Sequence, residues 1–312
     1  MDESEVLILI FAGVLTVGAW IGTMQAAMHR LYFRGNPGPG LVRAAVLASL
    51  FWIWLVCLVW ADESVQGIYV LFYLALGYAA VKMFGHVGSR ATGLRYRVDV
   101  LERRNPAAGM VVAAFVLATG LIFGGSLWGD ADPVGDDEGG WWIVWGFFLM
   151  GWIALVLVFR LWLGRERKQF PGKSGLLRRT YDPEDGRAAA LFLLAAAIPL
   201  TDAVAGDFWG WRHGLLTFGV LVGLLLAHEI FLGVAKGGAG AMAGASERGR
   251  GGVPDGGIAG ASEREDAGVS GSAAPAESSP GARATEGLVY LAVALAAWSA
   301  NRVLDLFLGP GG

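Results

Sequence analysis

The chain reads RRNPAAGMVVAAFVLATGLIFGGSLW over residues 103–128. Two arginines, an Asn-Pro pair and a nearly unbroken apolar run follow one another there. An Asn side chain can accept an N–H bond at a helix start, and Pro suits the first helical position because it lacks the N–H that would go unsatisfied. Roughly 20 apolar residues span the ~30 Å hydrocarbon layer of a bilayer. The stretch therefore predicts a membrane-spanning helix over about 107–128, capped by Asn105 and Pro106.

The same pattern occurs earlier in the chain. Residues 34–45 read RGNPGPGLVRAA, and Arg, Asn, Pro, Gly, Val and two Ala match residues 103–114 in register. Asn36 and Pro37 are thus predicted to cap a second helix, and the match predicts an internal repeat of two-helix units in one orientation. Residues 185–191 and 284–289 are read as weaker copies, with Gly186 and Arg187 in place of the Asn and its neighbour. The motifs act either as structural caps or, where several helix N-termini converge, as a site for an anion or a lipid headgroup.

Eight segments are long and apolar enough to span a membrane, in a chain with 55% hydrophobic and only 16% charged residues. They predict an all-α integral membrane protein of eight transmembrane helices, built as four tandem helical hairpins. Residues 1–135 form the first four-helix half and residues 136–312 the second. The predicted helices cover about 6–27, 41–61, 66–86, 107–128, 141–163, 187–208, 214–235 and 287–308.

Positive charge falls on one side of these segments. All 24 Lys and Arg residues except Arg212 and Arg302, which leaves 22, lie in or beside the loops of one side, and the loops of the other side are acidic or neutral. The positive-inside rule therefore predicts that both termini lie outside the cytoplasm. We expect the basic loops to bind anionic lipid headgroups, which accounts for them without nucleic acid. Six tryptophans stand at the opposite interface, as an aromatic belt requires: Trp60, Trp128, Trp141, Trp142, Trp209 and Trp211.

The repeated motif also carries a likeness to a known family. Glu102, Asn105 and the run Ala107-Ala108-Gly109-Met110 begin a helix that follows a span and a basic loop. This resembles the bacterial inner-membrane domain of unknown function 350 family, also called YjfL-like, whose members consist of tandem two-helix units. The likeness is strongest over about 66–210, and the chain is identified as an apparently duplicated, eight-helix member. The resemblance implies a multi-pass protein of the bacterial inner membrane and implies no biochemical activity.

The stretch before the last predicted helix has a different composition. Residues 236–286 consist mainly of Gly, Ala and Ser, with almost no aromatic or β-branched residues. Such a segment cannot bury enough apolar surface to offset its loss of conformational entropy, so a disordered cytoplasmic linker is predicted. The single cysteine, Cys57, lies inside the second span, which excludes a disulfide framework within one chain and predicts a small buried apolar residue.

Polar residues within the predicted spans form the candidate site. Ionisable groups there are costly and mark function by default. Asp202 and Arg302 fall at matching depth, roughly 20 Å from the cytoplasmic edge at ~1.5 Å per residue, and could pair. The cluster either locks helices together as a buried ion pair or lines a polar route through the second half for a proton or small solute. Its members are Asp202, Arg302, Asn301, Asp305, His228 and Glu229.

Three classes of function remain. A non-enzymatic membrane scaffold or stress-response component, acting through its cytoplasmic loops and a cytoplasmic protein partner, agrees best with the linker and the basic loops. A channel or secondary transporter agrees with the repeats and the polar cluster. An enzyme would need a nucleophile with its base, or a metal cluster, and the sequence offers neither, so no catalytic, metal or cofactor site is expected. GxxxG pairs at Gly18/Gly22, Gly120/Gly124 and Gly219/Gly223 favour close helix contacts and allow a homo-oligomer.

Overall fold

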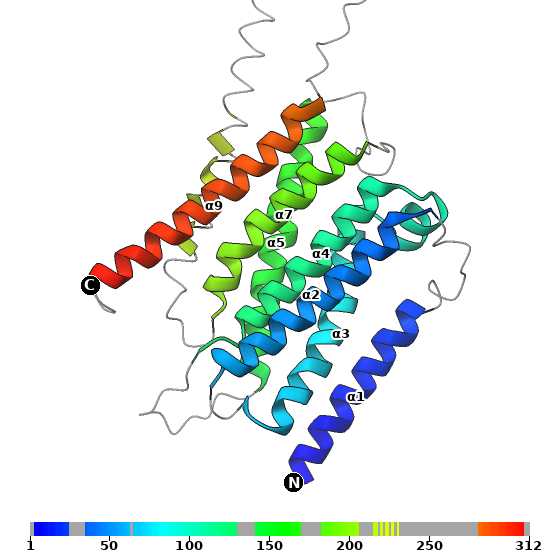
Figure 1. The fold of residues 1–312 in the computed structure, drawn as a ribbon, viewed down its shortest axis with the longest axis vertical. Coiled ribbons are helices and arrows are strands. Elements are labelled where there is room, and N and C mark those ends of the chain that lie inside the picture. Colours follow the sequence, from blue (N-terminus) through cyan, green and yellow to red (C-terminus); the bar gives the residue numbers. More distant parts are fainter. Residues whose placement is uncertain are drawn as a thin grey trace, which may run out of the picture. The chain divides into compact units, whose positions relative to one another are not determined.

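The computed structural model describes residues 3–24, 35–62, 65–129, 141–169, 182–205, 215–230 except 218, 221, 225, 228 and 229, and 280–308. Contacts divide the chain into one unit of residues 1–223 and 280–312 and a second of residues 224–279, whose few described residues are helical. The first unit contains the helices drawn in Figure 1 and a short π-helix, η3. They are α1 (Glu3–Met24), α2 (Pro37–Val59), α3 (Ile68–Ala91), η3 (Tyr96–Glu102), α4 (Pro106–Gly125), α5 (Trp141–Gln169), α7 (Pro183–Ala203) and α9 (Pro280–Leu308).

The described part of the chain is all-α and has five helices long and apolar enough to cross a membrane. These are α2, α3, α4, α7 and residues Val144–Glu166 of α5. Shorter apolar helical segments lie at Leu9–Gly22, Leu215–Leu224 and Gly287–Ala300. The length and composition of these helices therefore identify a multi-pass membrane protein, as predicted.

Three helices extend by five to seven residues beyond the predicted spans. α3 continues past residue 86 to Ala91, and α5 continues past residue 163 to Gln169. α9 begins at Pro280, inside the segment predicted as a disordered linker, so that prediction is wrong for residues 280–286. Pro is favoured in the first turn of a helix, and Ala, Arg and Glu there are good helix formers, so the helix starts before the apolar run does. Residues 236–279 of the predicted linker lie outside the described part.

α4 lies at the centre of the first unit, in contact with α2, α3, α5, α7 and η3 (Figure 1). Most of its residues are buried, including Phe115 and Phe123, which are fully enclosed. A helix that is apolar on every side suits a position surrounded by other helices. The Gly120/Gly124 pair of α4 contacts α2 through Ser49 and Trp52. The other two predicted GxxxG pairs, Gly18/Gly22 and Gly219/Gly223, have no such contact with the described residues.

Small residues let four helices approach one another near their starts, in the order α2, α4, α7, α9. A Cβ added to Gly109 of α4 would lie 2.7 Å from Cα of Gly38 in α2. One added to Gly186 of α7 would lie 2.5 Å from Cα of Ala107 in α4. Gly287 of α9 faces the backbone of α7 in the same way, with the carbonyl oxygen of Ala188 3.1 Å from the added Cβ. The contacts at Gly109 and Gly186 require glycine, because any side chain would separate the backbones, whereas at Gly287 a side chain would only press its neighbours by a few tenths of an ångström.

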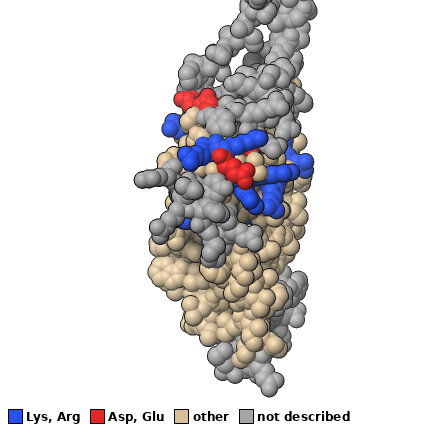
Figure 2. All heavy atoms as spheres, turned by 90° about the vertical axis from the view of Figure 1, so that its right-hand side faces the viewer, with Lys and Arg blue, Asp and Glu red and all other residues tan. Residues whose placement is uncertain are grey.

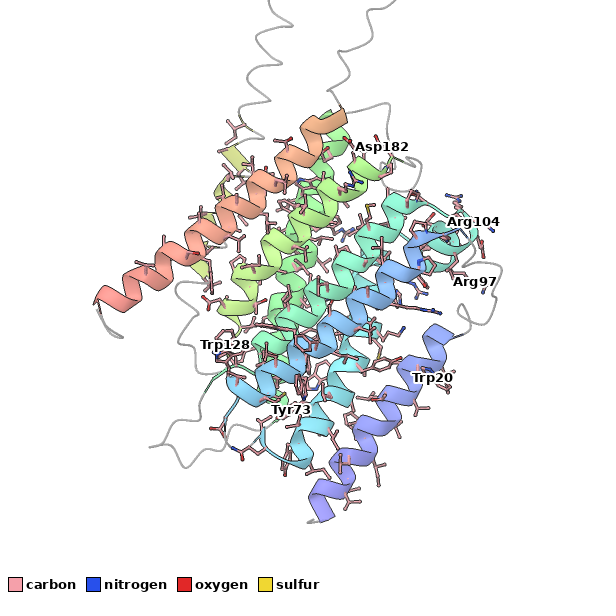
Figure 3. The ribbon with its side chains drawn as sticks, viewed as in Figure 1. Trp20, Tyr73, Arg97, Arg104, Trp128 and Asp182 are labelled. Carbon is pink, nitrogen blue, oxygen red and sulfur yellow. The ribbon has the colours of Figure 1, made fainter. Side chains whose placement is uncertain are left out.

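The two ends of this helix group differ in chemistry. At one end the rings of Trp60 and Trp128 stack with centroids 4.7 Å apart, and the Gly129 N–H donates a 3.0 Å hydrogen bond to the Trp60 carbonyl. Figure 3 shows Trp128 at this end and Arg97 and Arg104 at the other. Cys57, near the aromatic end of α2, is buried.

Candidate functional site

The helix starts at the basic end are held by side-chain caps. The Asn36 Oδ1 accepts a 3.1 Å bond from the Gly38 N–H, and Pro37 is the first residue of α2. The Asn105 Oδ1 accepts a 3.2 Å bond from the Ala108 N–H, and Pro106 begins α4. Each cap satisfies one of the backbone donors that a helix start leaves without an intrahelical partner. Both Asn residues are buried, so these donors are satisfied without water.

A third cap corrects the reading of the sequence at the start of α7. Gly186 and Arg187 were expected to replace the Asn and its neighbour, but the cap is Asp182, whose Oδ1 accepts a 3.0 Å bond from the Glu184 N–H. Pro183 follows it as the first helical residue. Aspartate and asparagine cap helices equally well, so Asp182-Pro183 begins α7 as Asn-Pro begins α2 and α4. In both α4 and α7 a buried glycine stands four residues after the cap, at Gly109 and Gly186.

The loop between α3 and α4 is folded around a buried carboxylate. Asp99 of η3 is fully buried and accepts a 2.7 Å bond from the Arg95 N–H and a 3.3 Å charge-assisted bond from Arg103 Nη1. Its backbone carbonyl accepts from the Asn105 N–H at 3.0 Å. The Asn36 Nδ2 donates a 2.7 Å bond to the Val100 carbonyl, which joins η3 to α2. This buried network fixes the loop against two helix starts.

Basic side chains cover the surface above this network. Figure 2 shows them gathered in a band across this end, with few acidic side chains among them. Burial raises the pKa of the Tyr96 phenol in η3 above its ordinary value, and the positive charge of Arg43 acts in the opposite direction. The exposed basic residues on α2, α3, η3 and the η3–α4 junction are Arg43, Arg90, Arg95, Arg97, Arg103 and Arg104. We call this set the basic face.

A second buried polar group lies between α5 and α9. Arg165 Nη2 is 2.8 Å from Glu166 Oε1, and Arg165 Nη1 donates a 2.7 Å bond to the Tyr290 hydroxyl. Arg165 and Glu166 are almost wholly buried at the end of the apolar part of α5. The Tyr290 ring packs edge-on against Phe192 of α7, so three helices enclose the group. A buried ion pair is stable only when its remaining donors and acceptors are also satisfied, and Tyr290 supplies one such contact.

From the sequence, Arg165 was predicted to lie in or beside a basic loop, and its burial with Glu166 and Tyr290 was not predicted. A signal was nevertheless present, because one stripe of buried side chains along α5 follows a regular spacing of four and three residues. They are Phe148, Trp152, Leu155, Phe159, Trp162 and Glu166. Glu166 continues the buried stripe, which indicates that the helix and its packing extend through the charged residues.

Of the predicted polar cluster, the structure describes one side chain in full. Asp202 is buried in the last turn of α7, one residue before its end at Ala203, and its carbonyl accepts a 3.2 Å bond from the Ala205 N–H. Asn301, Arg302 and Asp305 lie on α9, but their side chains are outside the described part. His228 and Glu229 also lie outside the described residues. The pairing of Asp202 with Arg302 stays a prediction. Among the described residues no group of three or more His, Cys, Asp or Glu side chains could hold a metal ion.

Comparison with known proteins gives one family. Residues 60–171 match the model of the family described as Domain of Unknown Function (DUF350). The matched segment contains α3, η3, α4 and all of α5, together with Asp99, Asn105 and the larger part of the basic face. No curated protein and no solved structure matches the chain.

Proposed function

Because residues 60–171 belong to the DUF350 family, whose description states no activity, we propose a function from the structure. In this proposal the protein is a non-enzymatic membrane scaffold. Its working surface in this proposal is the basic face, presented to the cytoplasm. The observation that carries the proposal is that this face rests on a buried hydrogen-bond network at Asp99, Asn105 and Asn36. A loop that only had to join two helices would not need such a fixed structure.

The charge of the basic face suits the recruitment of negatively charged partners. Arg97 contacts Glu102 at 3.3 Å, but its side chain is 75% exposed, so the pair adds little stability and leaves Arg97 available. Arg103 holds Asp99 from the rim while remaining nearly half exposed. Arg guanidinium groups bind carboxylates and phosphates through paired donors. The face can thus engage an acidic protein segment and the anionic surface of the membrane together.

The proposal includes a finer architecture than five candidate spans. In this architecture the protein has eight transmembrane helices, in two tandem four-helix halves related by parallel repeats. It lies in the bacterial inner membrane with both termini outside the cytoplasm. The equivalent caps at Asn36, Asn105 and Asp182 support the repeats, as do the glycines that follow in α4 and α7. The opposed aromatic and basic ends support the orientation, because basic residues are retained on the cytoplasmic side.

Site-specific photo-crosslinking in cells tests the scaffold function. A photo-reactive amino acid replaces Arg97 of the basic face, and the matched control replaces Val14, an exposed apolar residue of α1. The scaffold reading predicts a discrete protein adduct from position 97 and none from position 14. Neutralising the neighbouring Arg104 to Gln should reduce that adduct. Lipid adducts alone from both positions would contradict a protein scaffold.

The buried group at Arg165, Glu166 and Tyr290 favours a second candidate, a channel or secondary transporter. Charged residues that lie inside membrane helices often belong to ion or proton pathways. The test is proton or ion flux into liposomes that hold a trapped pH-sensitive dye, with the wild type beside Asp202→Asn and Glu166→Gln. Flux that is lost in a variant with an unchanged melting temperature would support transport. Absence of flux in the wild type, with destabilised variants, would leave these residues as structural locks.

A further inference from the structure

The helices α2, α4, α7 and α9 form a row in which each helix packs against the next, with α2 and α9 at the two ends (Figure 1). The face by which α4 joins this row carries Gly109, Val116 and Gly120, which stand 4, 11 and 15 residues after the α4 cap. Gly109 approaches Gly38 of α2. Ser49 Oγ of α2 donates a 3.3 Å bond to the Val116 carbonyl, and a Cβ added to Gly120 would collide with the same serine. One face of α4 thus docks on α2 along its length.

The corresponding face of α2 is exposed. Gly40, Leu47 and Phe51 stand at the same 4, 11 and 15 residues after the α2 cap, and none of the described helices covers them. A Cβ added to Gly40 would meet nothing within 4 Å, and Leu47 and Phe51 are 68% and 60% exposed. The exposed residues recur at intervals of four and three, as in the seam between parallel paired helices. They are Gly40, Ala44, Leu47, Phe51, Trp54 and Leu58, which we call the α2 end face.

The helix at the other end of the row, α9, has an exposed face of mostly small residues. α9 packs on α7 through Gly287, which approaches Ala188, and through Tyr290, whose ring meets Phe192. At ~100° per residue, the opposite side of α9 carries a second set of exposed residues that also recur at intervals of four and three. They are Val289, Ala292, Ala296, Ser299 and Val303, which we call the α9 end face. Both ends of the row therefore present a straight, exposed seam.

The two end faces are complementary in size and lie level with each other. The middle of the α2 end face consists of Leu, Phe and Trp, and the middle of the α9 end face consists of Ala, Ala and Ser. Helices associate in membranes through van der Waals packing, and small residues let a neighbouring helix approach closely. Gly38 and Gly287 lie at the close contacts near the two helix starts, and Leu47 and Ala296 each stand nine residues, roughly 14 Å, further along. Two α2 end faces would instead set large side chains against one another.

We propose that the α9 end face of a second copy of this chain docks on the α2 end face, so that the row of α2, α4, α7 and α9 continues from one chain into the next. The new contact is continuous with the contacts already present within the row. It joins two different faces, so the assembly grows head to tail until it closes into a ring. The inference goes beyond the scaffold proposal, because it does not depend on what the basic face binds. An assembly of this kind carries several basic faces and so binds a multivalent partner more tightly than one chain does.

The test is disulfide crosslinking in native membranes between two co-expressed full-length copies that carry different tags, both with Cys57→Ala. One copy carries Leu47→Cys and the other Ala296→Cys. We expect mild oxidation to give a covalent dimer that contains both tags. In the matched control Met83→Cys replaces Leu47→Cys. Met83 is also exposed, and it lies eight residues before the end of α3 at Ala91, where Leu47 lies ten residues after the start of α2 at Pro37. The control should lose the dimer.

A second measurement does not depend on disulfide geometry. Ala296→Trp places a large side chain on the α9 end face, and Val87→Trp places one on the exposed surface of α3 as its control. Counting fluorescently labelled copies per complex in membrane vesicles should give several for the wild type and for Val87→Trp, and mainly one for Ala296→Trp with an unchanged melting temperature. Single copies in the wild type would overturn the proposal, because lipid would then cover both end faces. So would a dimer that forms from Leu47→Cys alone, which would show α2 pairing with itself, or equal dimer yields from Leu47→Cys and Met83→Cys.

Discussion

The Asn36 side chain donates a 2.7 Å hydrogen bond to the backbone carbonyl of Val100, 64 residues further along the chain. The same side chain caps α2 through its Oδ1. Asn36 thus satisfies a helix start with one atom and fixes η3 to that start with the other. Asparagine is suited to both tasks, because its amide carries an acceptor and two donors on one short side chain. This bond makes the η3 loop part of the helix core.

The two tasks of Asn36 predict an unequal cost of removing helix caps. Asn36→Ala loses the cap, worth about 1 kcal/mol, and leaves the buried Val100 carbonyl without its donor, at about 1–3 kcal/mol. Asp182→Ala loses only an exposed cap and should cost about 1 kcal/mol. Chemical unfolding of both variants in detergent measures the difference. Equal destabilisation would mean that the Val100 bond contributes nothing.

The close approach of α2 and α4 predicts a steric effect at one glycine and none at its counterpart. Gly109→Ala places a Cβ 2.7 Å from Cα of Gly38, so the two backbones must separate. We expect a loss of about 1–3 kcal/mol in the free energy of unfolding, as for other overpacked sites. Gly40 also stands four residues after its cap, but an added Cβ there meets nothing within 4 Å.

Gly40→Ala is therefore the matched control for Gly109→Ala. It should leave stability unchanged or raise it by up to about 1 kcal/mol, since Ala favours a helix more than Gly does. The readout is the melting temperature of each variant in the same detergent. If both variants melted like the wild type, the backbone contact of α2 with α4 would not be tight.

The Arg165 group predicts a coupled loss of stability. Arg165→Gln breaks a buried ion pair and leaves the Glu166 carboxylate buried without its positive partner. Such a change typically lowers the free energy of unfolding by about 3–5 kcal/mol. Tyr290→Phe removes one hydrogen bond to a charged group, at about 1.5–3 kcal/mol. Because both changes remove the same bond, the double variant should be less unstable than the sum of the two. Arg187→Gln, an exposed change on α7, should stay within about 0.5 kcal/mol of the wild type. Strict additivity in the double variant would exclude coupling between Arg165 and Tyr290.

Local sequence chemistry was sufficient to predict the helix starts of α2 and α4. Asn-Pro before an apolar run indicates a cap whatever lies around it, so the starts were predicted to within a few residues. The cap at Asp182-Pro183 was not predicted, because Gly186 and Arg187, which are followed by alanines, were placed at the positions of the Asn and its neighbour. The multi-pass, all-α architecture was also predictable, because segment length and hydropathy alone decide it.

Long-range packing explains what the sequence did not predict. Asp99 is a charged residue in the connection between two helices, where an exposed side chain is expected. Its burial depends on Arg95, Arg103 and the helix start at Asn105. Arg165 looks like one more basic loop residue, and only its contact with Tyr290, 125 residues away, makes it part of the core. A single sequence contains no direct record of such pairs. The regular stripe through Glu166 was the only local indication of either group.

The direction in which the chain crosses the membrane gives the last prediction. In a background where the buried Cys57 is replaced by Ala, single cysteines are introduced as Gln66→Cys, before α3, or as Arg97→Cys, in η3. Both positions are exposed, and they precede and follow α3, a candidate span. With the basic face in the cytoplasm, a membrane-impermeant maleimide added to intact spheroplasts should label position 66 and should label position 97 only after permeabilisation. The reverse pattern would place the basic face outside and contradict the scaffold proposal. Labelling of both positions in intact cells would mean that α3 does not cross the membrane.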